Sequence, residues 1–412
     1  MSEAWSKPAL SESLSLLLPP PEETLLLRVC LSPGESARAA WRRWRNRRRM
    51  PGKALLRNNS FKKLRPLLFN AVQSHSLEID KEALTYLRTA YLKEELRDAA
   101  VRRICREVLL SLEKEGLAPI LLKGMALAET VYGNPVLRHC HDIDILLPDD
   151  QLSRPAVFLS SLGFRVCSAP QSQNRHLRML QDSGLPLEFH SNLFEVPYYQ
   201  MPLSEIRARG RSQAIAGVKT RILTPADNLL HVCGHASYSS KRQSLRWVTD
   251  AWFIISRHAD LDWESLSHDI RRSGLALPVS VMLGYLAESL DAPIPSNTLR
   301  SLSAAASHSR PIERQLALRG TRSDGRGSLQ ELFGRATNWR ERVFILQWLL
   351  FPSPHYLAWV DQVHPWLLPF HYLYRPLRYA RNRLQSSLKG ALGAISSRMG
   401  RLLRRSVAGN PH

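Results

Sequence analysis

Acidic residues are absent from two long segments of this 412-residue chain. No Asp or Glu lies between Glu35 and Glu78, where twelve Arg or Lys fall, and none follows Asp361, where nine more fall. The chain holds 57 Lys and Arg against 36 Asp and Glu, so the remainder is neutral once those 21 are set aside. The net charge of +21 therefore sits in two segments. Three readings stay open for them: a solvated helix face with a frayed tail, contact with an anionic membrane surface, or contact with nucleic acid.

Cysteine is scarce, and long apolar runs and a leader-like start are missing. The five cysteines are scattered without a CxxC pair, which argues against a disulfide framework or a zinc ribbon. No stretch reaches the roughly 18 uninterrupted apolar residues that cross a membrane. The first ten residues lack the basic-then-apolar layout of a signal peptide. We therefore expect a cytoplasmic protein without a transmembrane segment, at most peripheral at a membrane.

The spacing of apolar residues divides the chain into four parts. Residues 1–111 form a tail and a helical segment, with apolar positions three and four apart in 81–115. Residues 112–222 mix short strands with helices, residues 223–345 are helical again, and residues 346–412 are rich in Pro and aromatics and then basic. The predicted fold class is α+β, with a mixed β-sheet core between N-terminal helices and a C-terminal helical domain.

The most informative residues are Asp142 and Asp144, in an alternating strand expected over 141–147. Alternation places both carboxylates on one face, while Ile143 and Ile145 enter the core. Two adjacent carboxylates repel each other unless a proton or a cation neutralises them. Oxygen ligands favour Mg²⁺ or Mn²⁺ as that cation.

A third carboxylate comes from the segment Leu187-Glu188-Phe189-His190, where the same alternation exposes Glu188 and His190 together. If this strand lies beside the first, the three carboxylates can hold two ions about 4 Å apart, as in two-metal phosphoryl-transfer sites.

A phosphate-binding turn is expected upstream, at Lys123-Gly124. Gly124 allows close backbone approach, and the helix that follows presents free N–H groups to an anion. Lys123 adds a positive charge, and Arg138 supplies a forked donor suited to phosphate unless it pairs with a surface acid. Phosphates beside a metal-binding strand indicate phosphoryl or nucleotidyl transfer.

His231 and His235 stand four residues apart on a predicted helix that begins at Thr224-Pro225. A zinc site is conceivable there. The pair lacks the glutamate of a zinc protease, and no third ligand has a telling spacing. We expect His235 instead to pack between the helical part and the active site.

Taken together, these motifs resemble the uncharacterised nucleotidyltransferase family, a branch of the DNA polymerase beta-like nucleotidyltransferase superfamily. The resemblance runs from about residue 23 to 260 and rests on Lys123-Gly124, Arg138 with the strand after it, the segment around Glu188, and the helix from Thr224. It implies that Asp142, Asp144 and Glu188 bind metal and act in catalysis, with Lys123 and Gly124 on the phosphate side. The turn is Lys-Gly where the wider superfamily usually has Gly-Ser.

The expected reaction is metal-dependent transfer of a nucleoside monophosphate from an NTP to a hydroxyl or phosphate acceptor, with release of pyrophosphate. Glu188 either completes the metal site or takes the acceptor proton. Two rival hypotheses remain. The first is a non-catalytic nucleotide-binding partner protein, and the second is an RNA-directed nucleotidyltransferase recruited by the basic segments.

Deleting residues 385–412 tests the role of the basic tail. We expect turnover to stay unchanged, because no candidate site residue lies there, while solubility or partition onto anionic vesicles changes. Turnover assays and vesicle sedimentation of both forms check this. Loss of turnover in the truncated chain would contradict the peripheral role of the tail.

Overall fold

The structure is a computed structural model whose chain divides into two compact units, Met1–Ile345 and Leu346–His412. The residues it describes are 14–47, 61–168, 176–194, 196, 198, 199, 201–238, 245–321, 339, 340, 342, 343, 365–374 and 377. In the second unit, these residues form a 3₁₀ turn, η6 (Pro365–Leu367), and a helical stretch over 368–374. No helix within the described residues is long and apolar enough to cross a bilayer.

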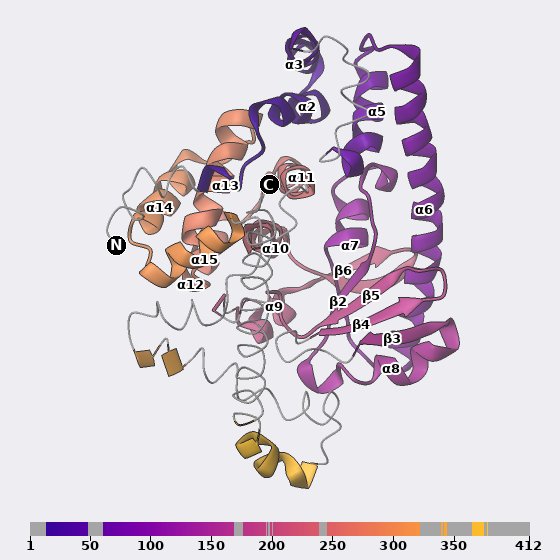
Figure 1. Cartoon of the computed structure of the whole chain (residues 1–412), viewed down its shortest axis with the longest axis vertical. Coiled ribbons are helices and arrows are strands. Elements are labelled where there is room, and N and C mark those ends of the chain that lie inside the picture. Colours follow the sequence, from indigo (N-terminus) through magenta and orange to yellow (C-terminus); the bar gives the residue numbers. More distant parts are fainter. Residues whose placement is uncertain are drawn as a thin grey trace, which may run out of the picture. The chain divides into compact units, whose positions relative to one another are not determined.

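A seven-stranded mixed sheet forms the centre of the first unit, in the order β3-β4-β5-β2-β1-β7-β6 (Figure 1). Its strands are β1 (Ile120–Leu122), β2 (Ile143–Leu146), β3 (Phe164–Ser168), β4 (His176–Gln181), β5 (Pro186–His190), β6 (Arg211–Ile215) and β7 (Val218–Ile222). The two parallel pairs are β2 with β5 and β1 with β7, and the other neighbours are antiparallel. The fold is therefore α+β.

Helices precede the sheet, and the longest of them, α6, runs alongside it (Figure 1). They are α2 (Pro21–Leu31), α3 (Gly34–Asn46), η2 (Lys62–Leu64), α5 (Arg65–Ser74) and α6 (Lys81–Lys114). In α3, Trp41 and Trp44 are buried with stacked rings, as their three-residue spacing predicts. Three arginines of α3 pair with acids: Arg38 and Arg42 with Glu35, and Arg45 with Glu78. Much of the charge of this basic helix is thus already matched within the protein.

Short helices lie between the strands, and longer ones follow the sheet. The former are α7 (Lys123–Thr130), η3 (Pro135–Leu137), η4 (Asp149–Gln151), α8 (Pro155–Phe158), η5 (Leu159–Leu162) and α9 (Leu203–Arg209). The latter are α10 (Pro225–Tyr238), α11 (Arg246–Arg257), α12 (Trp263–Arg272), α13 (Ala276–Leu290), α14 (Ser296–Ser307) and α15 (Pro311–Thr321). Helix α10 begins as the sequence predicts, with the Thr224 hydroxyl accepting from the Asp227 amide at 3.1 Å.

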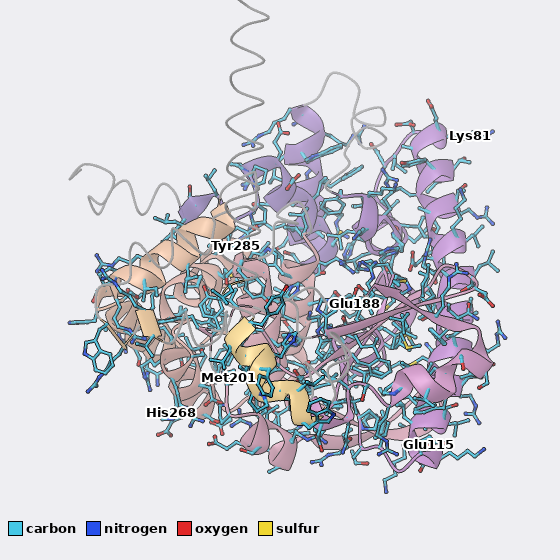
Figure 2. The ribbon with its side chains drawn as sticks, turned by 60° about the horizontal axis from the view of Figure 1, so that its bottom comes forward. Lys81, Glu115, Glu188, Met201, His268 and Tyr285 are labelled. Carbon is cyan, nitrogen blue, oxygen red and sulfur yellow. The ribbon has the colours of Figure 1, made fainter. Side chains whose placement is uncertain are left out.

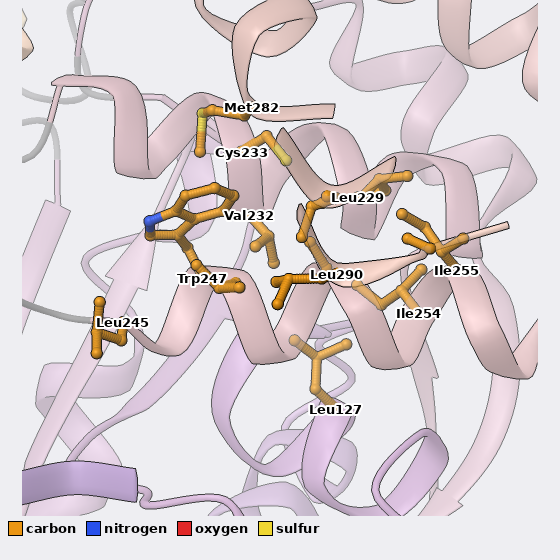
Figure 3. Packing of buried hydrophobic residues seen from close by; sticks show 14 of the residues in the cluster. Leu127, Leu229, Val232, Cys233, Leu245, Trp247, Ile254, Ile255, Met282 and Leu290 are labelled. Carbon is orange, nitrogen blue, oxygen red and sulfur yellow. The ribbon is translucent and has the colours of Figure 1, made fainter. Parts of the chain in front are cut away.

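A single hydrophobic core joins these parts. Buried side chains from α2, α5, α7, the sheet and α10 to α14 belong to one cluster. Figure 3 shows Leu127 of α7 lying with Ile254 of α11 and Leu290 of α13. Burying this apolar surface provides the main stabilising free energy, so the sheet and the helical part depend on each other for stability.

Several boundaries differ from the sequence prediction. The strand expected over 141–147 is shorter, Ile143–Leu146, so Asp142 lies outside it. Residues 155–162 form two short helices, α8 and η5, which end at Gly163 with a positive φ of 75°. The hairpin β6–β7 was not predicted; its turn places Ala216 and Gly217 at positive φ.

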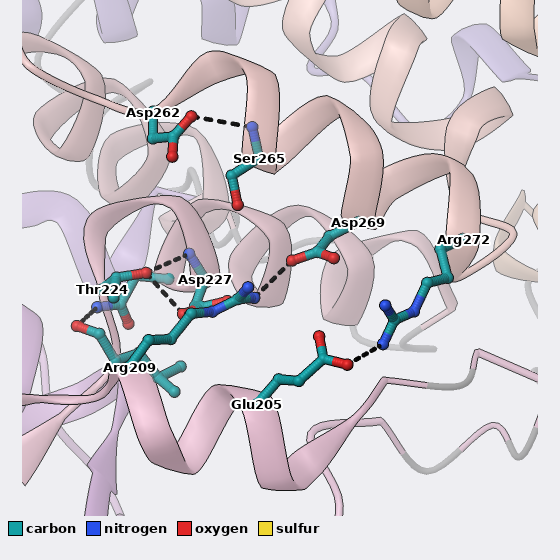
Figure 4. Close-up of polar contacts among 10 residues, drawn as sticks. Glu205, Arg209, Thr224, Asp227, Asp262, Ser265, Asp269 and Arg272 are labelled. Atoms are coloured by element: carbon teal, nitrogen blue, oxygen red, sulfur yellow. Dashed lines mark hydrogen bonds and ion pairs between the residues drawn. The ribbon is translucent and has the colours of Figure 1, made fainter.

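Arg209 of α9 fixes that helix to the helices after the sheet (Figure 4). Its guanidinium donates to Asp227 of α10, with Nε at 2.9 Å from Oδ2, and to Asp269 of α12. Glu205, one turn earlier, pairs with Arg272 of α12 at 3.0 Å.

A second ion pair joins the loop before β2 to α11 and is almost fully buried. Arg138 donates from Nε and Nη2 to the two carboxylate oxygens of Asp250, at 2.9 and 2.8 Å. Both side chains are only 5% exposed, and the Tyr132 hydroxyl also donates to Asp250 at 2.7 Å. A two-point bond of this kind sets the orientation of the loop as well as its distance from the helix.

Breaking this buried pair should destabilise the whole first unit. We expect Arg138→Met to lower the free energy of unfolding by about 3–5 kcal/mol, because Asp250 keeps a buried charge without its cation. Urea unfolding monitored by circular dichroism measures the loss. Arg138→Met combined with Asp250→Asn should recover part of it, and a loss below about 1 kcal/mol in the single variant would refute the structural role.

Candidate functional site

The parallel pairing of β2 with β5 brings two carboxylates side by side. In this register Asp144 lies opposite Glu188, while Ile145 lies opposite Phe189 in the core. The sequence predicted that Glu188 would meet Asp144 if their two strands were neighbours, and the strands are neighbours. In the view of Figure 2, Glu188 lies inward of the two ends of α6, which Lys81 and Glu115 mark.

His190 completes a group of three donors with these acids. Its Nε2 lies 3.0 Å from Asp144 Oδ1, to which it donates, and 3.9 Å from Glu188 Oε2. One ligand atom from each of Asp144, Glu188 and His190 lies within 4.8 Å of the others. Two carboxylates and an imidazole at this spacing suit a divalent ion that accepts both oxygen and nitrogen ligands. Within the described part of the chain, no other group of this kind was found.

Asp142 lies beside this group but not in it. It directly precedes β2, next to Ile143, and the charge of Asp144 acts on it. Its Oδ2 instead contacts His141 Nε2 at 3.1 Å. The donor set that the structure brings together therefore contains His190 in the place expected for Asp142. The signal was present in the sequence, because Glu188 and His190 are two residues apart on one strand.

The pKa of one of the three carboxylates is lowered, and the pKa values of the other two are raised. Burial raises the pKa of Asp142 and of Glu188, and the nearby charge of Asp144 raises both further. Burial also disfavours the ionised form of Asp144, but the Lys123 ammonium and the hydrogen bond from His190 outweigh it and hold the pKa of Asp144 well below its usual range. One carboxylate is thus firmly ionised, and its two neighbours would be ionised more easily if a cation were bound.

Lys123 lies at the turn from β1 into α7 with a strained backbone. Its φ is +38°, which a residue with a side chain rarely adopts. Such strain persists only where the surrounding structure imposes it, and it is concentrated at functional sites. Its charge acts on both Asp142 and Asp144. Gly124, next to it, packs tightly: an added Cβ would lie 3.4 Å from the carbonyl oxygen of Asp142.

Arg138 is placed differently from the expected phosphate donor. Its guanidinium is buried against Asp250, so the structure gives no support to a phosphate contact and favours ion pairing, in the interior and not on the surface. Arg178 of β4 is the arginine that reaches the acids. It lies opposite Glu188 in register, its Nε is 3.4 Å from Glu188 Oε1, and its side chain is 51% exposed.

Histidines surround the acids on two further elements. The ring of His176 in β4 lies 5.5 Å from that of His190, and burial together with the charge of His190 lowers the pKa of His176 to about 4. His231 of α10 is fully buried, and burial and the Lys123 charge hold its pKa well below the ordinary value. His235, one turn on, acts electrostatically on Asp144, as expected for a residue between α10 and the site. Neither α10 histidine belongs to the three-donor group, so a zinc site there gains no support.

Replacing Glu188 tests whether this group binds a divalent ion. Because its raised pKa means that the folded state holds the proton more tightly, stability falls as pH rises through that pKa. Glu188→Gln should remove this part of the loss of stability with rising pH. At pH 7.5 the metal-free variant should be at least as stable as the metal-free wild type. It should also lose the stabilisation by Mn²⁺, which in the wild type reaches about 2.7 kcal/mol at one hundred times the dissociation constant.

Thermal unfolding with and without Mn²⁺ measures both effects. Glu113→Gln, at an exposed position of α6, is the matched control and should respond to Mn²⁺ like the wild type. An equal Mn²⁺ response in Glu188→Gln would show that this carboxylate is not a ligand.

A family model described as uncharacterised nucleotidyltransferase matches residues 53–291, more than half of the chain. The matched range includes Lys123, Asp144, Glu188 and His190, together with α10 and α11. No curated protein and no solved structure matches the chain.

Proposed function

We propose a reaction for this chain from one premise, that it belongs to the uncharacterised nucleotidyltransferase family. The proposed activity is metal-dependent transfer of a nucleoside monophosphate from an NTP to a hydroxyl or phosphate acceptor. The observation that carries it is the pairing of Asp144 with Glu188 next to the strained Lys123 turn. Acids that a cation would relieve, beside a lysine at a helix N-terminus, suit a site for a metal-bound polyphosphate.

The proposed metal ligands are Asp144, Glu188 and His190, and Asp142, two residues before Asp144, is a fourth ligand that would join them when an ion binds. This donor set fits Mg²⁺ or Mn²⁺, and the imidazole favours Mn²⁺. A bound divalent ion would polarise the phosphoryl oxygens and offset the charge that develops on them. His190 donates to Asp144 in the metal-free structure. With an ion bound, it would either ligate the ion or hold that carboxylate in place.

Lys123, Gly124 and Arg178 are the proposed phosphate-side residues. The first two begin α7, whose free N–H groups favour an anion, and the ammonium of Lys123 adds a full charge. Arg178 is half exposed beside Glu188, so its guanidinium can leave that carboxylate for a phosphate oxygen when the acid binds a cation.

In the proposed step, an oxygen of the acceptor attacks the α-phosphorus of the NTP. The bond between that phosphorus and the oxygen bridging to the β-phosphate breaks, and pyrophosphate leaves with the bonding electron pair. The acceptor proton passes to a site carboxylate and then to solvent. The helices that follow the sheet would select the acceptor, since specificity comes from the site built around a fold and not from the fold itself.

The basic segments have no established partner. In α3, the two carboxylates of Glu35 and Glu78 pair with three arginines, so the helix keeps a net positive charge. All nine basic residues after Asp361 lie outside the described residues. Recruitment to an anionic membrane surface or to RNA is therefore a role that either basic segment can serve.

Transfer of label from each α-labelled NTP, with Mg²⁺ or Mn²⁺ and a pool of candidate acceptors, tests the proposal. Asp144→Asn and Asp142→Asn should each lower the transfer at least about 100-fold, because several kcal/mol of charge stabilisation is lost with a metal site. Asp260→Asn, exposed in the turn between α11 and α12, is the matched control and should transfer normally.

Two outcomes would contradict the proposal. Ordinary transfer by Asp144→Asn would remove the metal site from the mechanism. NTP binding without transfer to any acceptor, weakened but not abolished by Asp144→Asn, would favour the non-catalytic nucleotide-binding protein.

A further inference from the structure

His141 lies between a cation and the carboxylate of Asp142. Its Nδ1 is 3.1 Å from Nη1 of Arg246, and its Nε2 is 3.1 Å from Asp142 Oδ2. The same Arg246 nitrogen also lies 3.2 Å from the carbonyl oxygen of His139. Three residues thus form a chain of polar contacts from α11 to the loop that carries Asp142.

The chemistry of the two end groups decides where the proton of His141 lies. A guanidinium has only donors, so Nδ1 facing Arg246 must accept. A neutral imidazole that accepts at Nδ1 carries its hydrogen on Nε2. A carboxylate has only acceptors, so an Nε2–H is the form of His141 that can face Asp142 Oδ2 at 3.1 Å without repulsion between lone pairs. Both contacts are satisfied at once by the neutral Nε2–H tautomer of His141, whereas the Nδ1–H tautomer would satisfy neither.

The loop before β2 is held on several sides, so the contacts of Arg246 and His141 act on a fixed backbone. Arg138 binds Asp250 of α11, and Nδ1 of His139 lies 2.7 Å from Glu94 of α6. Gly124 packs against the Asp142 carbonyl, as described above. With the backbone held, the remaining freedom of Asp142 is rotation of its side chain, and the 3.1 Å contact with His141 restricts that rotation.

We propose that Arg246 and His141 are positioning residues that orient the Asp142 carboxylate, Arg246 by selecting the Nε2–H tautomer and His141 by facing Oδ2 with that Nε2–H. The inference rests on the proposed function for its consequence, since an oriented Asp142 serves the metal site beside it. Helix α11 is then part of the catalytic apparatus, although it contributes no metal ligand. Partners of this kind typically change metal affinity or activity 10- to 100-fold when they are removed.

The tautomer is directly observable. Selective ¹⁵N labelling of histidine, with long-range ¹H–¹⁵N correlation on the full chain, distinguishes protonated from unprotonated ring nitrogens, and the peaks that vanish in His141→Gln assign the residue. We expect Nε2 protonated and Nδ1 unprotonated in the wild type near pH 7.5. In Arg246→Met the two tautomers should mix, whereas Arg103→Met, an exposed arginine of α6, should leave the spectrum of His141 unchanged. An Nδ1–H or charged His141 in the wild type would overturn the proposal.

Two substitutions at His141 separate its two contacts. Gln reproduces the donor at the Nε2 position, whereas Asn reproduces only the Nδ1 side. Mn²⁺ affinity, measured by calorimetry, should stay within about threefold of the wild type in His141→Gln and fall at least about tenfold in His141→Asn. Equal losses in the two variants, with both folded by circular dichroism, would refute the positioning role.

These measurements also separate this inference from the proposed reaction. The tautomer and the Mn²⁺ affinities are read without any transfer of label. The wild type could show the Nε2–H tautomer and the expected order of affinities but no transfer to any acceptor. The positioning role would then stand, and the proposed reaction would be wrong. An Nδ1–H tautomer in a protein that does transfer label would support the reaction and refute the positioning role.

Discussion

The parallel pairing of β2 with β5 is the constraint on which the rest of the site depends. Strand register places Asp144 directly against Glu188, and both strands carry core residues on the opposite face, so neither acid can move away without disturbing the core. Two partly buried carboxylates at this distance need compensation. The cations and donors around them follow from that need: the ammonium of Lys123 at a strained turn, the imidazole of His190, and the half-exposed guanidinium of Arg178.

The helices after the sheet contribute to the site through contacts that are mostly polar and buried. Asp250 and Arg246 of α11 hold the loop before β2, while α10 brings His231 and His235 toward the acids. One hydrophobic core runs through both parts. The sheet and the helices after it are therefore joined by polar contacts to the loop before β2 as well as by this core.

Sequence reasoning anticipated much of this arrangement where local pattern is informative. Alternation in the segment around Glu188 correctly predicted a strand with Glu188 and His190 on one face, and the Thr224-Pro225 start correctly predicted α10. It failed where the role of a residue depends on burial or on a partner that is distant in the sequence. Arg138 has the side chain of a phosphate donor, but Asp250, 112 residues away, engages it in the interior. Arg178 was not singled out in the sequence, and the pairing of β4 with β5 places it opposite Glu188.

What the sequence alone determined was the inventory: acids on alternating positions of short apolar strands, a lysine at a strand-to-helix turn, and a charge excess confined to two acid-poor segments. Periodicity is a local property, so residue order suffices to specify it. Which donors meet was decided only by tertiary structure. His190 joins Asp144 through the β2–β5 register, and His141 meets Arg246 although 105 residues separate them. Electrostatic interactions and hydrogen bonds depend on distances in space, and those exist only once the chain has folded.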